Sequence, residues 1–241
     1  MASARQRAGA ALNRAKTQLT GPLTGLLGGS FNPAHGGHRR ITQFAIRALG
    51  LDEAWWLVSP GNPLKPAQGM APLPARIASA RQQARRAPIR VSAMEREFGT
   101  RFTVDTLRKI LHRWPKRRFI WLMGADNLAQ FHRWRHWRDI ARMVPIAVIA
   151  RPGYDGAAIA SPAMVWLGRY RRSAARFRNS ADWSAPRLVI LRFDPDSRSA
   201  TAIRSSDPHW ASRMPTRAVR DSDLLLRDGV TRRLILPDNL S

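Results

Sequence analysis

The chain has 241 residues, 44% of them hydrophobic, which is enough to bury a full core within one domain. It contains no cysteine, which excludes disulfides and thiolate chemistry. Lys and Arg number 41 against 16 Asp and Glu, a net charge of +25, so the two classes to separate are an enzyme that binds anionic substrates and a nucleic-acid-binding protein.

The N-terminal segment, residues 1–22, is rich in Ala, Arg and Gly and shows no clear apolar period. It lacks the apolar core of a signal peptide, and nowhere does the chain contain about eighteen consecutive apolar residues. We therefore expect a flexible basic extension on a cytoplasmic protein that does not enter a membrane.

The first strand and helix enclose the most informative segment of the chain. The apolar run 23–27 predicts a buried strand and the amphipathic run 39–49 a helix, with GGSFNPAHGGH at 28–38 between them. N–H groups at a helix start have no intrahelical partner and attract anions, so this turn predicts a phosphate site. Gly28 and Gly29 would let a triphosphate approach the backbone, and Gly36 and Gly37 would let the chain turn sharply.

Two histidines in this segment, His35 and His38, are three residues apart and would share one side of a helical turn. Both could then donate N–H bonds to one phosphate. Two ordinary polar residues or half of a metal site are the alternatives, although no cysteine is present to complete a zinc set. His132 and His136 also have helical spacing, but without the Glu of HExxH they favour a solvated or ligand-facing helix over a metal site.

Strands and helices alternate through the middle of the chain. Further strands are expected at 54–58, 119–123 and 146–150, and Thr103 is expected to cap a helix. Between 154 and 186 we expect a helix and a surface loop. This alternation predicts an α/β fold with a parallel, doubly wound sheet whose ligands bind at the carboxyl ends of the strands.

A second anion site is predicted after the last strand, 188–193. Two hydroxyl residues and an arginine lie at the start of a short predicted helix there. Ser199 or Thr201 would be its N-cap, and the guanidinium of Arg204 would bind the anion. By itself this pattern is equally typical of an ordinary helix cap.

The segment 28–38 is similar to the signature of the nucleotidylyltransferase superfamily, GGxFxPxHxGH, and 199–204 resembles its second signature, (I)SxTxIR, with Arg198 replacing the usual apolar residue. The intervening features, in order, resemble the bacterial nicotinate-nucleotide adenylyltransferases. They are Lys65 after a Pro-rich loop, the FTVDTL helix start at 102–107, the turn at 124–128, Trp134, and Arg151-Pro152-Gly153.

The resemblance covers residues 23–206 and implies a single Rossmann-like nucleotidylyltransferase domain there. Residues 207–241 depart from the family and are expected to pack on the same domain. The implied reaction transfers the adenylyl group of ATP to nicotinate mononucleotide, giving deamido-NAD and pyrophosphate, with Mg²⁺ held mainly by ATP phosphates and no protein metal site. Alternatives are the same transfer to nicotinamide mononucleotide or another HxGH nucleotidylyl transfer.

The resemblance also implies roles for individual residues. His35, His38 and Arg204 would be catalytic. The ATP side would comprise Gly28, Gly29, Ser30, Phe31, His35, His38, Gly124, Asp126, Ser199, Thr201 and Arg204. The mononucleotide side would comprise Asn32, Lys65, Thr103, Trp134 and Arg151.

Some of these residues have plainer readings. Lys65 could be a solvated charge, Asp126 a helix cap and Trp134 a core residue instead of a ring that stacks on the pyridine, while Trp137 is expected in the core. Arginines are spread along the whole chain and only four lysines occur, at 16, 65, 109 and 116, so nucleic acid is an unexpected partner. A homo-oligomer is left open.

Overall fold

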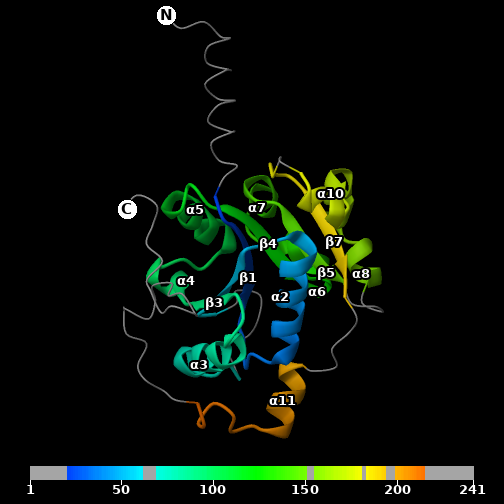
Figure 1. The fold of residues 1–241 in the computed structure, drawn as a ribbon. Coiled ribbons are helices and arrows are strands. Elements are labelled where there is room, and N and C mark those ends of the chain that lie inside the picture. The colour runs from blue at the N-terminus through cyan, green and yellow to red at the C-terminus, as the bar shows by residue number, and fades with distance from the viewer. Residues whose placement is uncertain (1–20, 62–68, 151–154, 181–182, 194–198, 215–241) are drawn as a thin grey trace, which may run out of the picture.

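The structure is a computed structural model that describes residues 21–61, 69–150, 155–180, 183–193 and 199–214 (Figure 1). The predicted N-terminal extension and most of the C-terminal segment lie outside these residues. Trp210, within the described part of the C-terminal segment, is buried.

A seven-stranded sheet forms the centre of the fold, in the order β3-β2-β1-β4-β5-β7-β6, with every pair parallel. Its strands are β1 (Leu23–Gly29), β2 (Glu53–Val58), β3 (Ile89–Ser92), β4 (Arg118–Gly124), β5 (Ile146–Ala150), β6 (Arg171–Arg172) and β7 (Leu188–Arg192). The chain moves outward from β1 to β3, then crosses to the other side of β1 at β4. The predicted doubly wound parallel sheet is confirmed, and β1 and β4 flank its switch point.

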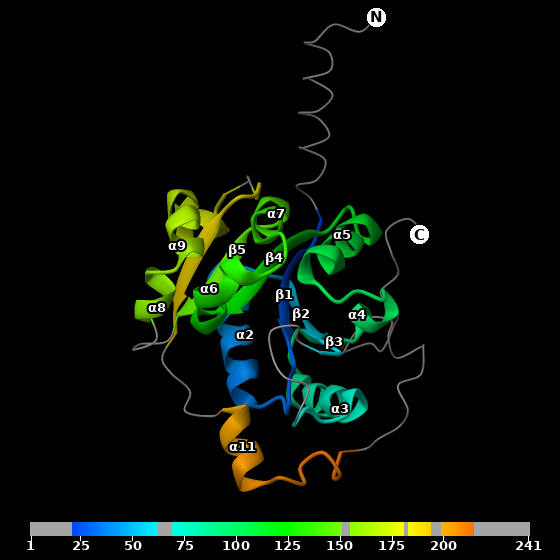
Figure 2. The same cartoon turned by 180° about the vertical axis from the view of Figure 1, so that it is seen from behind.

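Helices cover both faces of the sheet because successive side chains of a strand point in opposite directions. In β2, Trp56 and Val58 join one core cluster, and Trp55 and Leu57 join the other. The first cluster is completed by α2 (Gly36–Leu49), α3 (Leu73–Ala84) and α10 (Ala174–Arg178). The second, facing the viewer in Figure 2, is completed by α4 (Met94–Glu97), α5 (Thr103–Arg113), α6 (Ala125–Gln130), η1 (Phe131–Arg133), α7 (Trp137–Met143), α8 (Asp155–Ile159) and α9 (Pro162–Leu167).

The predicted strands are confirmed as β1, β2, β4, β5 and β7, with bounds close to those expected. Two short strands, β3 and β6, and the 3-10 turn η2 (Gly168–Tyr170) were missed because they offer too few residues to show a period. The prediction of one helix across His132 and His136 is wrong. His132 lies in η1, and His136 takes a left-handed conformation, with φ of 50°, that separates η1 from α7.

Among the described residues, no helix combines the length and the apolar character that crossing a membrane requires.

Candidate active site

A cavity of about 290 Å³ lies at the carboxyl ends of β1 and β4. This is where the strand order reverses, the place at which doubly wound sheets bind ligands. Its walls include ten of the residues predicted for the site: Gly28, Gly29, Ser30, Phe31, Asn32, His38, Thr103, Gly124, Asp126 and Trp134.

The turn after β1 is held by an aromatic residue in an unusual conformation. Phe31 has a φ of 47°, which costs a non-glycine residue on the order of 1 kcal/mol. Its buried ring stacks on Trp56 with centroids 5.0 Å apart and lies 5.0 Å from the ring of His38. Aromatic packing therefore offsets the backbone cost and fixes the position of His38.

The two histidines meet at the start of α2. His35 is the N-cap, its Nδ1 accepting the N–H of Gly37 at 3.1 Å, and Nδ1 of His38 accepts the N–H of His35 at 3.2 Å. Their ring centroids are 3.9 Å apart, so the predicted common side is confirmed. Because each Nδ1 is an acceptor, each ring carries its proton on Nε2, the tautomer that donates from the far side of the ring.

The glycines of this segment act differently from what the sequence predicted. Gly36 and Gly37 form no sharp turn, because they are the first residues of α2 and neither has a positive φ. A Cβ on Gly28 would lie 2.8 Å from the indole of Trp121 in β4, so packing between the strands already requires glycine there. A Cβ on Gly29 would make only an ordinary contact with Phe31 at 3.4 Å.

The second predicted anion site lies beside the first. Ser199 is the N-cap of α11 (Ala200–Ser206), its hydroxyl accepting the N–H of Ala202 at 3.1 Å, so of the two proposed caps Ser199 is correct. Arg204 donates to the carbonyl of Asn32 at 2.7 Å and to the hydroxyl of Thr201 at 3.2 Å. Both views show α11 next to the N-terminal end of α2 (Figures 1 and 2).

A buried arginine that sequence reasoning missed joins the loops around the cavity. Arg76 of α3 is 1% exposed and donates to the carbonyl oxygens of Ser30 and Ser59 at 2.8 and 2.6 Å, and to those of Pro60 and Ala71 at 3.1 and 2.8 Å. Burial lowers the pKa of its guanidinium. One side chain thus ties the segment after β1 to the segment after β2.

The Asn32 side chain serves the same scaffold. Its amide donates to the carbonyl of Gly69 at 2.9 Å and accepts the N–H of Ala71 at 3.1 Å. Asn32 was predicted to contact the mononucleotide, and in the structure it lines the cavity while both ends of its side-chain amide bond backbone.

The β4 side of the cavity corrects the prediction for Thr103 and excludes the alternative reading of Asp126 as a helix cap. Thr103 is the first residue of α5, whose N-cap is Phe102 without a side-chain cap bond, so Thr103 is not the cap. Asp126 does not cap α6, whose N-cap is Gly124. A Cβ on Gly124 would lie 2.4 Å from Oδ1 of Asp126, so the glycine leaves room for this carboxylate at the cavity wall.

Trp134 lies at the cavity and also packs against core residues, so its position is compatible with both readings of the sequence. It lines the cavity, is partly buried, and makes edge contacts with Trp121 at 6.2 Å and Phe131 at 5.3 Å. Trp137 is partly buried and packs against Phe131 and Trp166, in line with its expected core position.

The sequence did not reveal the remaining charged residues of the cavity. Arg101, Arg133 and Arg135 line it, which favours an anionic ligand. Glu95 of α4 also lines it and is 8% exposed. Burial raises the pKa of this carboxyl to about 7, with a hydrogen bond to Ser59 acting in the opposite direction. None of the four stands in a recognisable motif, although Arg133 and Arg135 flank Trp134.

Two predicted site residues, Lys65 and Arg151, lie outside the described residues. Within the described part of the chain, no group of three or more His, Asp or Glu side chains could hold a metal ion.

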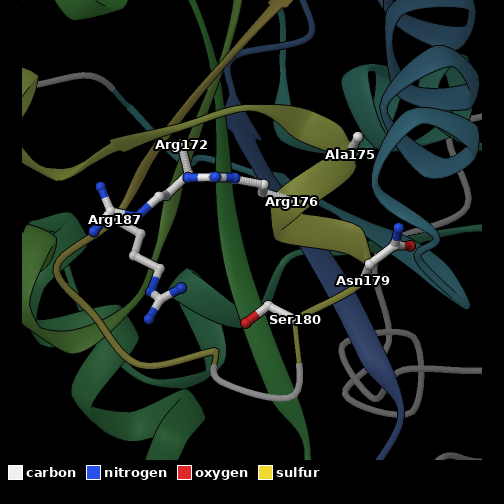
Figure 3. A pocket seen from close by; sticks show the side chains of 6 residues that line it. All are labelled: Arg172, Ala175, Arg176, Asn179, Ser180 and Arg187. Carbon is white, nitrogen blue, oxygen red and sulfur yellow. The ribbon is translucent and has the colours of Figure 1, made fainter.

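A second hollow lies at the edge of the sheet formed by β6 and β7, near the start of β7 (Figure 3). Three arginines line it, Arg172, Arg176 and Arg187, with Asn179 and Ser180. It shares no lining residue with the cavity at the carboxyl ends of the strands.

Comparison with known proteins gives concordant matches. The family model described as cytidylyltransferase-like matches residues 26–206. A probable nicotinate-nucleotide adenylyltransferase of Erythrobacter litoralis is 68% identical over 212 residues, 88% of this chain and 94% of the relative. Its namesake in Parvibaculum lavamentivorans is 51% identical over 184 residues, 76% of this chain and 92% of the relative.

A solved structure shares the fold at low identity. Plasmodium falciparum nicotinic acid mononucleotide adenylyltransferase, complexed with NaAD, aligns with a TM-score of 0.57 at 13% identity, covering 76% of this chain and 83% of its own.

Proposed function

The chain belongs to the cytidylyltransferase-like family, among its nicotinate-nucleotide adenylyltransferases, and on this premise we propose how its residues carry out the reaction. The reaction transfers the adenylyl group of ATP to nicotinate mononucleotide in NAD biosynthesis. An oxygen of the mononucleotide's 5′-phosphate attacks the α-phosphorus of ATP. As the new P–O bond forms, the bond to the β-phosphate breaks, and deamido-NAD and pyrophosphate result.

The attacking phosphate is already ionised, so the protein's work is to position two anions and stabilise the charge that moves between them. We assign the triphosphate to the start of α2, where backbone N–H groups and Nε2–H of His35 and His38 are donors. This assignment rests mainly on the positions of the His35 and His38 rings at the start of α2. Their centroids are 3.9 Å apart, so the two Nε2–H groups can donate to one ligand.

Arg204, Ser199 and Thr201 would hold the leaving pyrophosphate. The bond from Arg204 to the carbonyl of Asn32 supports this, because it holds the second anion motif against the first. Gly124 and Asp126 would contact the adenosine, with Gly28, Gly29, Ser30 and Phe31 along the nucleotide.

Thr103 and Trp134 would line the acceptor side, with Asn32 shaping it and Lys65 and Arg151 assigned by resemblance alone. An aromatic face beside a cavity rich in arginine suits a planar pyridine that carries a carboxylate.

Mg²⁺ would enter as part of the MgATP substrate and neutralise phosphate charge. The cavity residues fit this arrangement, because Asp126 and Glu95 stand on different elements and form no metal-binding cluster with other described side chains. The metal would then be held by phosphate oxygens and water.

One assay tests both the reaction and its acceptor. We expect a higher kcat/KM for nicotinate mononucleotide than for nicotinamide mononucleotide, measured side by side with ATP and Mg²⁺. The opposite order would assign the enzyme to the amide substrate, and no turnover of either would refute the proposed function. A cytoplasmic location stays a prediction.

A further inference from the structure

Glu95 is a buried carboxyl group at the cavity for which the proposed mechanism has no use. It lies on α4, which follows β3, and it lines the cavity together with Ser59 and Gly61 from the segment after β2. Both elements stand on one side of β1, and Gly124 and Asp126 at the end of β4 stand on the other. Glu95 is therefore separated from the residues assigned to the adenosine.

Ser59 is the side-chain hydrogen-bond partner that the described residues provide for Glu95. The bond with Ser59 lowers the pKa of Glu95, as expected for a bond that the carboxylate accepts. A carboxyl group has two oxygens that can accept, so one bond with Ser59 leaves Glu95 able to accept a further hydrogen bond from a ligand in the cavity.

The chemistry of the two substrates restricts what this oxygen can bind. Phosphates and a pyridine carboxylate are anions, and a carboxyl group is a poor neighbour for either, since ionisation would bring like charges together. The arginines of the cavity and the histidines of α2 suit those anions instead. The pyridinium ring has no N–H to donate, so the neutral donors that remain are the ribose hydroxyls and the amino group of adenine, and a buried carboxyl group can accept from either.

We propose that Glu95 binds a ribose hydroxyl of the acceptor mononucleotide and thereby selects a ribonucleotide in the acceptor position. The acceptor ribose is favoured over that of ATP because Glu95 lies on the side of β1 opposite Gly124 and Asp126, and because Thr103, assigned to the acceptor, lines the same cavity. This inference rests on the proposed function, which supplies the identity of the acceptor.

The test combines variants with substrate analogues. Glu95→Ala is expected to lower kcat/KM for nicotinate mononucleotide roughly ten- to a hundredfold, mainly through KM, as for the loss of one hydrogen bond with a charged or strongly polar partner. For the wild type, the 2′-deoxy or the 3′-deoxy acceptor should cost a similar factor. For Glu95→Ala the same analogue should cost less than about threefold, because the partner is already absent.

Two controls separate binding from folding. Glu95→Gln keeps the shape and an acceptor oxygen and should retain most of the discrimination. Glu97→Ala changes a residue of the same helix that pairs with Arg113 and does not line the cavity, and it should behave as the wild type with every analogue. Thermal melts identify any variant that fails to fold. If Glu95→Ala does so, Glu95→Met, which keeps the length of the side chain but has no carboxyl oxygen, takes its place in the comparison.

The outcomes are distinct. Equal sensitivity of wild type and Glu95→Ala to both deoxy acceptors, with normal wild-type turnover of nicotinate mononucleotide, would overturn the role of Glu95 alone. Coupling to deoxy-ATP in place of the deoxy acceptor would also overturn it, by assigning Glu95 to the adenosine. Absence of wild-type turnover with nicotinate mononucleotide would refute the proposed function and with it the acceptor named here.

Discussion

Replacing Arg76 by alanine is expected to destabilise the protein strongly and to disorganise the cavity. Its guanidinium makes four hydrogen bonds to backbone carbonyls of the segments after β1 and β2. A hydrogen bond to a charged group contributes about 1.5–3 kcal/mol, but a direct sum overestimates the effect, because burying the guanidinium has its own cost. That cost is visible in the lowered pKa of Arg76.

We therefore expect a loss of about 3–5 kcal/mol in unfolding free energy, the range for breaking a buried charged network. Arg76→Lys should lose roughly half as much, because an ammonium concentrates its donors on one atom and cannot span carbonyls on opposite sides of the fork. Both variants should lower kcat/KM, since Ser30 and Ser59, whose carbonyls they release, line the cavity.

Urea unfolding followed by tryptophan fluorescence measures the stability of each variant. Arg81→Ala, an exposed position of the same helix, is the matched control and should cost less than about 1 kcal/mol. A loss below about 1 kcal/mol for Arg76→Ala, with unchanged kcat/KM, would refute the reasoning that Arg76 organises these loops.

Four further predictions concern the site and the charge. His38→Ala should raise the activation barrier by roughly 2.7–4 kcal/mol, and so lower kcat, with little effect on ATP binding. A kcat within about threefold of the wild type would show that His38 has no catalytic role. Trp134→Ala should raise KM for the mononucleotide but not for ATP. It should lower the unfolding free energy by less than the roughly 3–5 kcal/mol of a fully buried Trp, since the ring is only partly buried. Thermal melts and two-substrate kinetics measure the two effects, and an unchanged KM for the mononucleotide would argue against stacking. Burial raises the pKa of Glu95 from 4.5 to about 7, so folding favours its protonated form. The unfolding free energy of the wild type relative to Glu95→Gln should therefore fall as pH rises from 4.5 through 7, by a few kcal/mol at most. A difference in urea unfolding that stays constant across this range would contradict the burial effect. Despite the charge of +25, binding to random duplex DNA should be weak at about 150 mM salt and turnover should need no nucleic acid, whereas submicromolar binding to one DNA or RNA sequence would support the rival class.

The sequence by itself determined the sheet and the local chemistry of its first turn. Apolar runs of five or six residues separated by amphipathic stretches were enough to predict β1, β2, β4, β5 and β7 and their parallel arrangement, because each run reports its own burial. The pair His35 and His38 could also be predicted, since three residues of helix set their separation without help from the rest of the chain. The weaker local predictions failed where backbone geometry depends on neighbours, as at Thr103, Gly36 and the His132 to His136 segment.

Only the tertiary structure decided which distant groups share the cavity. Arg204 bonds the carbonyl of Asn32 across 172 residues of chain, and Arg76 reaches Ser30 across 46. Glu95 stands in an ordinary charged turn of sequence, and its burial follows from the position of α4 beside β2 and β3. No spacing along the chain encodes these contacts, because they form only when the folded sheet brings segments that are distant in sequence to the carboxyl ends of its strands. The residues that we propose for phosphate chemistry can therefore be predicted from the sequence, whereas the scaffold that positions them forms only in the folded protein.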